Sequence, residues 1–268
     1  MGIENLKIQI SKLASHLRQR RTRRFHCYCV GAAKTGTTSI ASSFGKFYKT
    51  AHEPEALKTN RLVIDYLEGN IAGEGLREHL LDRDKRLRLE LESAHPLGYV
   101  SGVLADIFPQ SLFIVTIREP LSWLHSRLNF HHKTDSPAWA EYRQYFWMQR
   151  HTGFAPEETF LQRYKLCSLD TYLGQYADHY RRVFSEIPED RRLVVDTSEI
   201  ENMLPGIAGF LGADPLKIVR SHNKRDENKI KPLDEIDEAF INGKIMRHCS
   251  ELVSKYFSER LSYYTNSI

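Results

Sequence analysis

A glycine-rich loop near the start of the chain, VGAAKTGTT over residues 30–38, constrains the fold more than any other feature. The stretch before it, RFHCYCV at 24–30, has the composition of a short buried strand. The stretch after it, at 39–47, is expected to form a helix, because Thr38 or Ser39 can start one. Strand, glycine loop and helix in this order form the first half of a β-α-β unit. The chain is therefore predicted to be an α/β protein.

The rest of the chain continues this alternation of strand-like and helix-like segments. Further strands are predicted at 46–57, 87–93, 112–117 and 191–196. Further helices are predicted at 60–86, with a break at its glycines, and at 97–108, 121–131, 137–150, 168–186, 203–212 and 234–262. The pattern indicates one domain at 25–268, with a mostly parallel central sheet that helices cover on both faces.

Polar side chains follow the predicted strands at the points where they end. In a parallel sheet the carboxyl ends of the strands meet at one edge, where ligands bind. We therefore expect these side chains to line one pocket: Lys34, His52, Glu53, His95, Arg118 and Asp196.

Composition limits the class of protein. The chain has 268 residues, of which 41% are hydrophobic, enough to bury the core of one domain. It contains no run of about 18 to 20 apolar residues that would cross a membrane, and no apolar signal peptide at its start. We therefore expect a cytoplasmic protein. The four cysteines lack metal-binding spacing, so buried reduced thiols are expected and no metal site: Cys27, Cys29, Cys167 and Cys249.

The first 24 residues form a separate basic segment. They carry seven basic side chains against one acidic one, Glu4, although the whole chain has a net charge of only +4. Apolar residues recur at helical spacing: Ile3, Leu6, Ile10, Leu13 and Leu17. The segment 1–24 is predicted to be a basic amphipathic helix. It would contact a membrane surface, pair with another helix or pack on the domain as a solvated face.

The glycine loop has the chemistry of an anion site. Backbone N–H groups of the loop and of the first helical turn point at an anion, and Lys34 adds a positive charge. Hydroxyl groups at residues 35 and 37–39 add further donors. A glycine loop without a ligand is the alternative.

A second basic element follows the strand at 112–117. Arg118 ends this strand, and Ser126 follows eight residues later, about two turns into the next helix. An arginine fork and a serine hydroxyl suit a second phosphate, whereas an ion pair of Arg118 with Glu119 is the structural alternative. Two such elements indicate a ligand with two separated anionic groups.

These motifs resemble those of sulfotransferases. AAKTGTT, at 32–38, resembles the family's 5′-phosphosulfate loop, whose common form is P-K-[ST]-G-T-[TS]. IREPLSWLHSRL, at 117–128, is similar to the 3′-phosphate motif, in which an arginine and a serine eight residues later hold the 3′-phosphate. LVVDTSEIENMLPGIAGFLGAD, at 193–214, is similar to a later strand, acidic turn and helix of the family.

The resemblance implies a fold, a donor and binding residues. The fold would be the sulfotransferase fold, which is like that of P-loop nucleotide hydrolases. The donor would be 3′-phosphoadenosine 5′-phosphosulfate (PAPS), with no metal and no nucleic-acid partner. The resemblance assigns the donor site to Lys34, Thr35, Gly36, Thr37, Thr38, Ser39, Arg118 and Ser126, with Lys224 and Arg225 in place of a late basic triplet. Residues 224 and 225 also fit an ordinary basic surface loop.

Two residues compete for the role of catalytic base beside Lys34. His95 precedes Arg118 by 23 residues and resembles the histidine of a K-T-H-L-P stretch in soluble branches of the family. Glu53, before Pro54, resembles a glutamate of the carbohydrate branches. Either residue also fits a polar group hydrogen-bonded at a strand end. Ser39 stands where many members stack a tryptophan on adenine, so that contact stays unassigned.

The acceptor is predicted to be the hydroxyl of a carbohydrate or glycolipid, with a small alcohol or phenol second. Two other functions fit parts of the sequence. A P-loop kinase or hydrolase would need a lysine just after the second loop glycine, where Thr37 stands. An inactive binding module would be expected to lack Lys34, Arg118 or Ser126, and all three are present.

Overall fold

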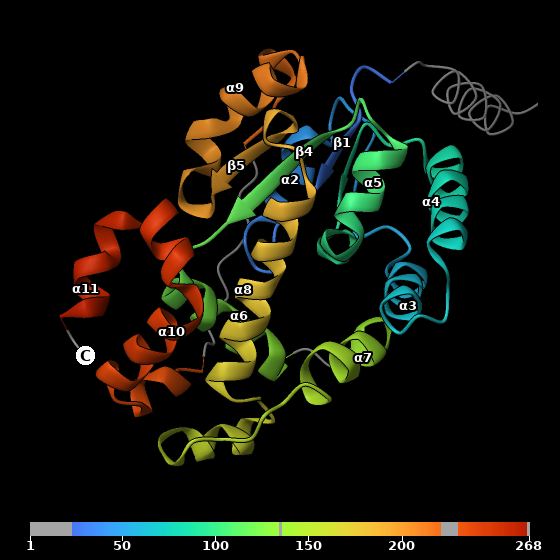
Figure 1. The fold of residues 1–268 in the computed structure, drawn as a ribbon. Helices are drawn as coiled ribbons and strands as arrows, with labels where there is room; N and C mark the ends of the chain where they lie inside the picture. Colours follow the sequence, from blue (N-terminus) through green and yellow to red (C-terminus); the bar gives the residue numbers. More distant parts are fainter. Residues whose placement is uncertain (1–22, 134–135, 221–229, 267–268) are drawn as a thin grey trace, which may run out of the picture.

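The computed structural model describes residues 23–133, 136–220 and 230–266 (Figure 1). Five strands form one sheet in the order β2-β3-β1-β4-β5, and every neighbouring pair is parallel. Their bounds are Cys27–Cys29 (β1), Thr50–His52 (β2), Leu91–Ser93 (β3), Leu112–Ile117 (β4) and Arg192–Asp196 (β5). The prediction of an α/β fold with a parallel central sheet is confirmed.

Helices follow or precede each strand, as the sequence predicts. The α-helices span Thr37–Phe44 (α2), Ala56–Leu67 (α3), Gly73–Leu87 (α4), Ser101–Ile107 (α5), Pro120–Lys133 (α6), Pro137–Arg143 (α7), Leu169–Glu186 (α8), Ile200–Leu211 (α9), Glu238–Tyr256 (α10) and Leu261–Thr265 (α11). None of the helices in the described ranges is long and apolar enough to cross a membrane. The amphipathic helix predicted at 1–24 lies outside the described residues, apart from Arg23 and Arg24.

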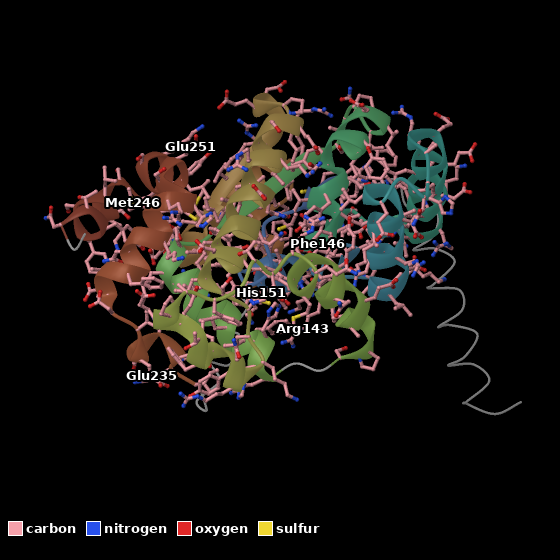
Figure 2. All side chains as sticks on the ribbon, turned by 60° about the horizontal axis from the view of Figure 1, so that its bottom comes forward. Arg143, Phe146, His151, Glu235, Met246 and Glu251 are labelled. Carbon is pink, nitrogen blue, oxygen red and sulfur yellow. The ribbon has the colours of Figure 1, made fainter. Side chains whose placement is uncertain are left out.

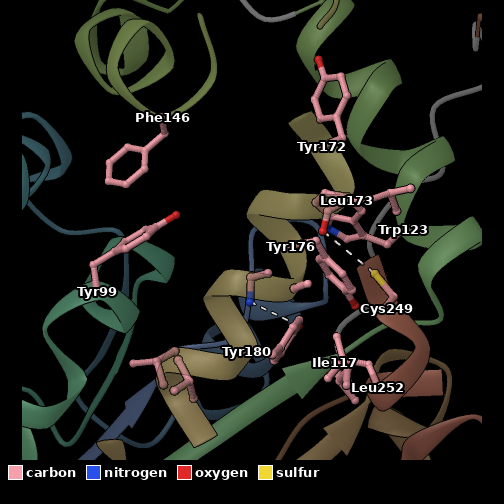
Figure 3. Packing of buried hydrophobic residues seen from close by; sticks show 14 of the residues in the cluster. Tyr99, Ile117, Trp123, Phe146, Tyr172, Leu173, Tyr176, Tyr180, Cys249 and Leu252 are labelled. Atoms are coloured by element: carbon pink, nitrogen blue, oxygen red, sulfur yellow. Dashed lines mark hydrogen bonds between the residues drawn. The ribbon is translucent and has the colours of Figure 1, made fainter. Parts of the chain in front are cut away.

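Alternation along the strands builds a core on each face of the sheet. Cys27 and Cys29 of β1 point into a smaller core that also receives α2 and α9, whereas Tyr28 points into a larger one. Both thiols are buried and free, as predicted. In the larger core, α8 contributes aromatic side chains (Figure 3): Tyr172 and Tyr176 contact His131 and Trp123 of α6, and Tyr180 donates to the carbonyl of Thr116 in β4.

The limits of three helices differ from the prediction. The segment predicted as one helix at 97–108 is a 3-10 helix at His95–Val100 followed by α5. Gly98 lies so close to His179 that an added Cβ would be 2.5 Å from its Cε1. The helix predicted at 137–150 is α7, which continues as a π-helical turn at Gln144–Met148. The last helix breaks where Phe257 turns into the core, between α10 and α11.

The segment after α6, residues 137–151, forms a wall that packs against α3 and α8. Figure 2 shows Arg143, Phe146 and His151 on this stretch. α7 contacts α3, and the π-helical turn contacts α8. The buried side chains of Tyr142, Phe146 and Trp147 join this wall to the larger core. The wall closes the space beyond the carboxyl ends of the strands.

Candidate active site

A pocket of about 1640 Å³ opens at the carboxyl ends of the strands. Each of the five strands supplies a polar residue at or just beyond its end. These residues are Lys34 after β1, His52 and Glu53 at the end of β2, His95 after β3, Arg118 after β4 and Asp196 at the end of β5. The prediction that these six side chains share one pocket is confirmed.

Two glycines let the loop after β1 take its path. Gly31 lies so close to β4 that an added Cβ would be 2.0 Å from Oγ1 of Thr116. Gly36 has a φ of 94°, and an added Cβ there would be 2.3 Å from Cδ1 of Ile200. Lys34 has a φ of 72°, which is uncommon for a residue with a side chain. The loop is thus held in one conformation, close to the sheet.

Carbonyl groups of the loop are tied to the elements around it. Ala33 accepts from Nε1 of Trp123 at 2.9 Å, and the carbonyl of Thr35 accepts from Oγ1 of Thr197 at 2.7 Å. These hydrogen bonds fasten the loop to α6 and to the turn after β5. A glycine loop that leads into the start of a helix has the chemistry of an anion site.

Thr35 differs from its predicted role as a hydroxyl donor to phosphate. Its side chain is fully buried, and it is not among the residues that line the pocket. Its hydroxyl donates to the carbonyl of Ala32 at 2.6 Å and lies 2.7 Å from the hydroxyl of Thr116. The Thr35 side chain therefore fixes the loop to β4.

The other hydroxyl groups of the loop line the pocket. Thr37, Thr38 and Ser39 form the first turn of α2, where helix N–H groups lack helical partners. Nε2 of His52 lies 3.2 Å from the hydroxyls of both Thr37 and Thr38. Nζ of Lys34 lies 4.9 Å from the ring centre of Phe130. A cation, hydroxyl groups and helix N–H groups therefore meet at this end of the pocket.

Arg118 connects β4 with the glycine loop. Its Nη1 donates to the carbonyl of Lys34 at 3.3 Å, and its Nε donates to the hydroxyl of Ser122 at 2.9 Å. Tyr176 bonds to both the N–H and the carbonyl of Arg118 and holds its backbone in place. Burial lowers the pKa of Arg118 from its usual value. Ser126 lines the same pocket, while Lys224 and Arg225 lie outside the described residues.

The two residues that compete for the role of base form one pair. Nδ1 of His95 donates to Oε1 of Glu53 at 2.7 Å. Only 7% of the surface of the His95 side chain is exposed. Nε2 of His95 has no hydrogen-bond partner among the described residues. The hydrogen bond to Glu53 leaves Nε2 as the nitrogen that accepts a proton.

Opposing effects set the protonation of this pair. Burial lowers the pKa of His95, and the Glu53 carboxylate opposes only part of that effect. Burial alone would raise the pKa of Glu53, but the hydrogen bond and charge of His95 leave it lowered. At neutral pH the pair is therefore a neutral imidazole beside a carboxylate, the form that a general base requires.

Aromatic rings enclose the imidazole. Trp139 stacks on His95 with ring centres 5.0 Å apart, and Tyr142 meets it edge-on at 5.2 Å. Arg127, which was not predicted as a site residue, lines the same pocket and shares a small cavity with His95 and Tyr142. The only signal for Arg127 is its place next to Ser126, since a charged residue on an α6 face cannot be assigned to the core from sequence alone.

Within the part of the chain that the structure describes, no three His, Cys, Asp or Glu side chains are grouped to hold a metal ion. The groups that face the pocket instead suit an anionic ligand on one side and a proton transfer on the other. Lys34, the start of α2 and Arg118 supply the first, and His95 with Glu53 supplies the second.

Comparison with known proteins identifies a family whose model matches this chain. A family model described as "Sulfotransferase domain" matches residues 27–212, more than half of the chain. The chain is similar to the solved sulfotransferase from Alicyclobacillus acidocaldarius, with 16% identity over 91% of this chain and 100% of that chain and a TM-score of 0.49. It is also similar to the sulfotransferase domain of the Synechococcus PCC 7002 olefin synthase, with 16% identity over 80% and 86% of the two chains and a TM-score of 0.40. No curated protein matches it.

Proposed function

Because the chain belongs to the sulfotransferase domain family, we propose that it transfers a sulfuryl group from PAPS to an acceptor hydroxyl. One observation carries the proposal: two anion-binding elements and a buried histidine–glutamate pair line the same pocket. The anion-binding elements follow β1 and β4, which are neighbours at the middle of the sheet. Glu53 and His95 follow β2 and β3, which lie together on one side of β1 and β4 in the sheet. Donor and acceptor would therefore approach from different sides.

The loop after β1 is assigned to the 5′-phosphosulfate. N–H groups of the loop and of the start of α2 would hold its oxygens, with Thr37, Thr38 and Ser39 as further donors. Lys34 would neutralise the negative charge that grows on the oxygen between sulfur and phosphate as their bond breaks. Arg118 and Ser126 are assigned to the 3′-phosphate, because both line the pocket beside the loop.

His95 is assigned as the base and Glu53 as its positioning residue. Nε2 of His95 takes the proton of the acceptor hydroxyl while the acceptor oxygen bonds to sulfur. The bond from sulfur to the 5′-phosphate oxygen breaks, and adenosine 3′,5′-bisphosphate leaves. Glu53 fixes the tautomer of His95 and stabilises the imidazolium that forms.

The acceptor is assigned to the carbohydrate or glycolipid class. Trp139 borders the pocket next to His95 and is only partly buried, so it offers an aromatic ring of the kind on which sugar rings stack. Such rings would present a hydroxyl beside Nε2 of His95.

Binding measurements test the donor assignment. The purified protein is titrated by calorimetry with adenosine 3′,5′-bisphosphate, and separately with ATP and Mg²⁺. We expect the bisphosphate to bind at least tenfold more tightly, because only it carries a 3′-phosphate for Arg118. Tighter binding of ATP would refute the assignment. Incubation with sulfur-labelled PAPS and a panel of sugars and glycolipids then tests turnover.

A further inference from the structure

Arg127 on α6 is a buried cation without an anionic partner. Only 3% of its surface is exposed, although its guanidinium group belongs to the pocket wall. Its Nε has no hydrogen-bond partner, and within residues 23–133, 136–220 and 230–266 Arg127 forms no ion pair. Its contacts are with aromatic rings, since Cζ lies 4.6 Å from the ring centre of Trp147 and 5.6 Å from that of Phe130.

A cation in this position is costly for the protein. Burying an unpaired charge costs several kcal/mol, of which contacts with aromatic rings return on the order of 2 kcal/mol. Burial accordingly lowers the pKa of Arg127. An apolar side chain would suit the free protein better at this position. An arginine here makes physical sense if an anion reaches it during function.

Glu53 is the carboxylate whose charge acts on Arg127, and it is already engaged. It accepts from His95 and is not within ion-pair distance of Arg127. The anion that Arg127 lacks would therefore come from a ligand.

Arg127 lies on the acceptor side of the proposed reaction. Its charge acts on both His95 and Glu53, and it shares a small cavity with the His95 ring. Both Cζ of Arg127 and Nζ of Lys34 lie near the Phe130 ring, at 5.6 Å and 4.9 Å from its centre. Ser126, the neighbouring residue on α6, is assigned to the donor. Successive helix residues point about 100° apart, so Arg127 faces a different part of the pocket.

We propose that Arg127 binds a negatively charged group of the acceptor, so that the acceptor is a hydroxyl compound with a carboxylate or an ester sulfate or phosphate near the reacting hydroxyl. The inference rests on the proposed function. The guanidinium fork suits these anions because each offers two oxygens at the matching spacing. The charge would also orient the acceptor, which places one particular hydroxyl at Nε2 of His95.

Matched acceptors that differ only in the group at carbon 6, neutral or charged, test this inference. The protein is saturated with adenosine 3′,5′-bisphosphate and titrated with 4-nitrophenyl glucuronide, glucoside, glucoside 6-sulfate and glucoside 6-phosphate. Tryptophan fluorescence reports binding, because Trp139 and Trp147 border this part of the pocket. We expect at least one charged compound to bind tenfold or more tightly than the neutral glucoside, and which one identifies the anion. Equal or weaker binding of all three charged compounds would overturn the inference.

Two variants separate binding from folding. Arg127→Met should abolish the preference for the charged compound, while bisphosphate affinity stays within about twofold and the melting temperature stays equal or rises. Arg143→Gln is the matched control, because this arginine of the same wall donates to the carbonyls of His131 and Lys165. It should lower the melting temperature and keep the preference. An Arg127→Met protein that keeps the preference would overturn the inference, whereas a wild-type protein that fails to bind the bisphosphate would refute the proposed function itself.

Discussion

Nδ1 of His95 and Oε1 of Glu53 lie 2.7 Å apart, so that side chains that follow two neighbouring strands, β3 and β2, form one pair. The pairing gives the two residues different roles, because the carboxylate holds one imidazole nitrogen and leaves the other for the acceptor. It also makes the activity sensitive to pH, since only a neutral imidazole accepts a proton.

Replacing Glu53 by Gln should change the rate and its pH dependence together. The carboxylate raises the pKa of His95 against the effect of burial, so its removal lowers that pKa further. The fall in kcat/KM on the acid side should therefore move to lower pH in Glu53→Gln. At neutral pH kcat should fall about 100-fold, because the imidazolium loses its counter-charge. An acid limb that stays in place, or that moves to higher pH, would remove Glu53 from this role.

Replacing Lys34 should affect turnover far more than stability. Lys34→Ala is expected to lower kcat by about 100-fold to 1000-fold, because the lysine acts on charge that develops in the transition state. Lys34→Gly serves as the control for the backbone, since the φ of 72° suits glycine better than alanine. The glycine variant should melt at a higher temperature than the alanine variant and be equally slow. A Lys34→Gly protein with the kcat of the wild type would contradict the assignment of Lys34 to the transition-state charge.

Replacing Arg118 should weaken binding of the bisphosphate. Hydrogen bonds to a charged group are worth about 1.5 to 3 kcal/mol, so Arg118→Ala should raise the Kd roughly 10-fold to 100-fold in calorimetry. Arg118→Lys should lie between, because lysine keeps the charge and loses the fork. Arg191→Gln is the control, as Arg191 donates to the carbonyls of Ala105 and Phe108 away from the pocket. An Arg118→Ala protein with wild-type affinity would exclude the 3′-phosphate assignment.

Thr35 should matter for folding through its hydroxyl. Thr35→Val keeps the shape but leaves the carbonyl of Ala32 and the hydroxyl of Thr116 without their partner. We expect the free energy of unfolding to fall by about 1 to 3 kcal/mol in urea denaturation. Thr35→Ser should recover most of the loss. If the Thr35→Val protein has the same free energy of unfolding as the wild type, the hydroxyl of Thr35 does not anchor the loop.

The buried imidazole of His179 should make the fold sensitive to acid. Its Nε2 donates to the carbonyl of Val30 at 2.8 Å, and burial lowers its pKa to about 4. Below pH about 6.5 the unfolded chain binds a proton that the folded chain does not, so stability falls as the pH drops from 6.5 toward 4. The loss is on the order of 3 kcal/mol. His179→Gln should reduce this slope in urea denaturation measured at several pH values, and an unchanged slope would contradict the explanation.

The strands and the residues at their ends were predictable because each is a local pattern. The strand β4 is a run of six apolar or β-branched residues that ends at Arg118, and no other part of the chain is needed to recognise it. The same holds for Lys34, whose loop is continuous in sequence.

The pairing of His95 with Glu53 was not predictable from the sequence. The two residues are 42 positions apart, and they meet only because β2 pairs with β3 rather than with β1. The burial of Thr35 depends in the same way on Thr116 of β4. That Arg127 forms no ion pair within the described part of the chain depends on where the surrounding elements place their carboxylates. These are properties of the assembled sheet and its helices.

The strand order has a consequence for how such an enzyme could diversify. The groups assigned to the donor follow the central strands β1 and β4, whereas the base and its partner follow β3 and the edge strand β2. Substitutions along the β2 edge and α7 would reshape the acceptor side without touching a loop that is fastened to the middle of the sheet. A laboratory selection for new acceptors should therefore accumulate its changes on that side, and spare the sheet centre.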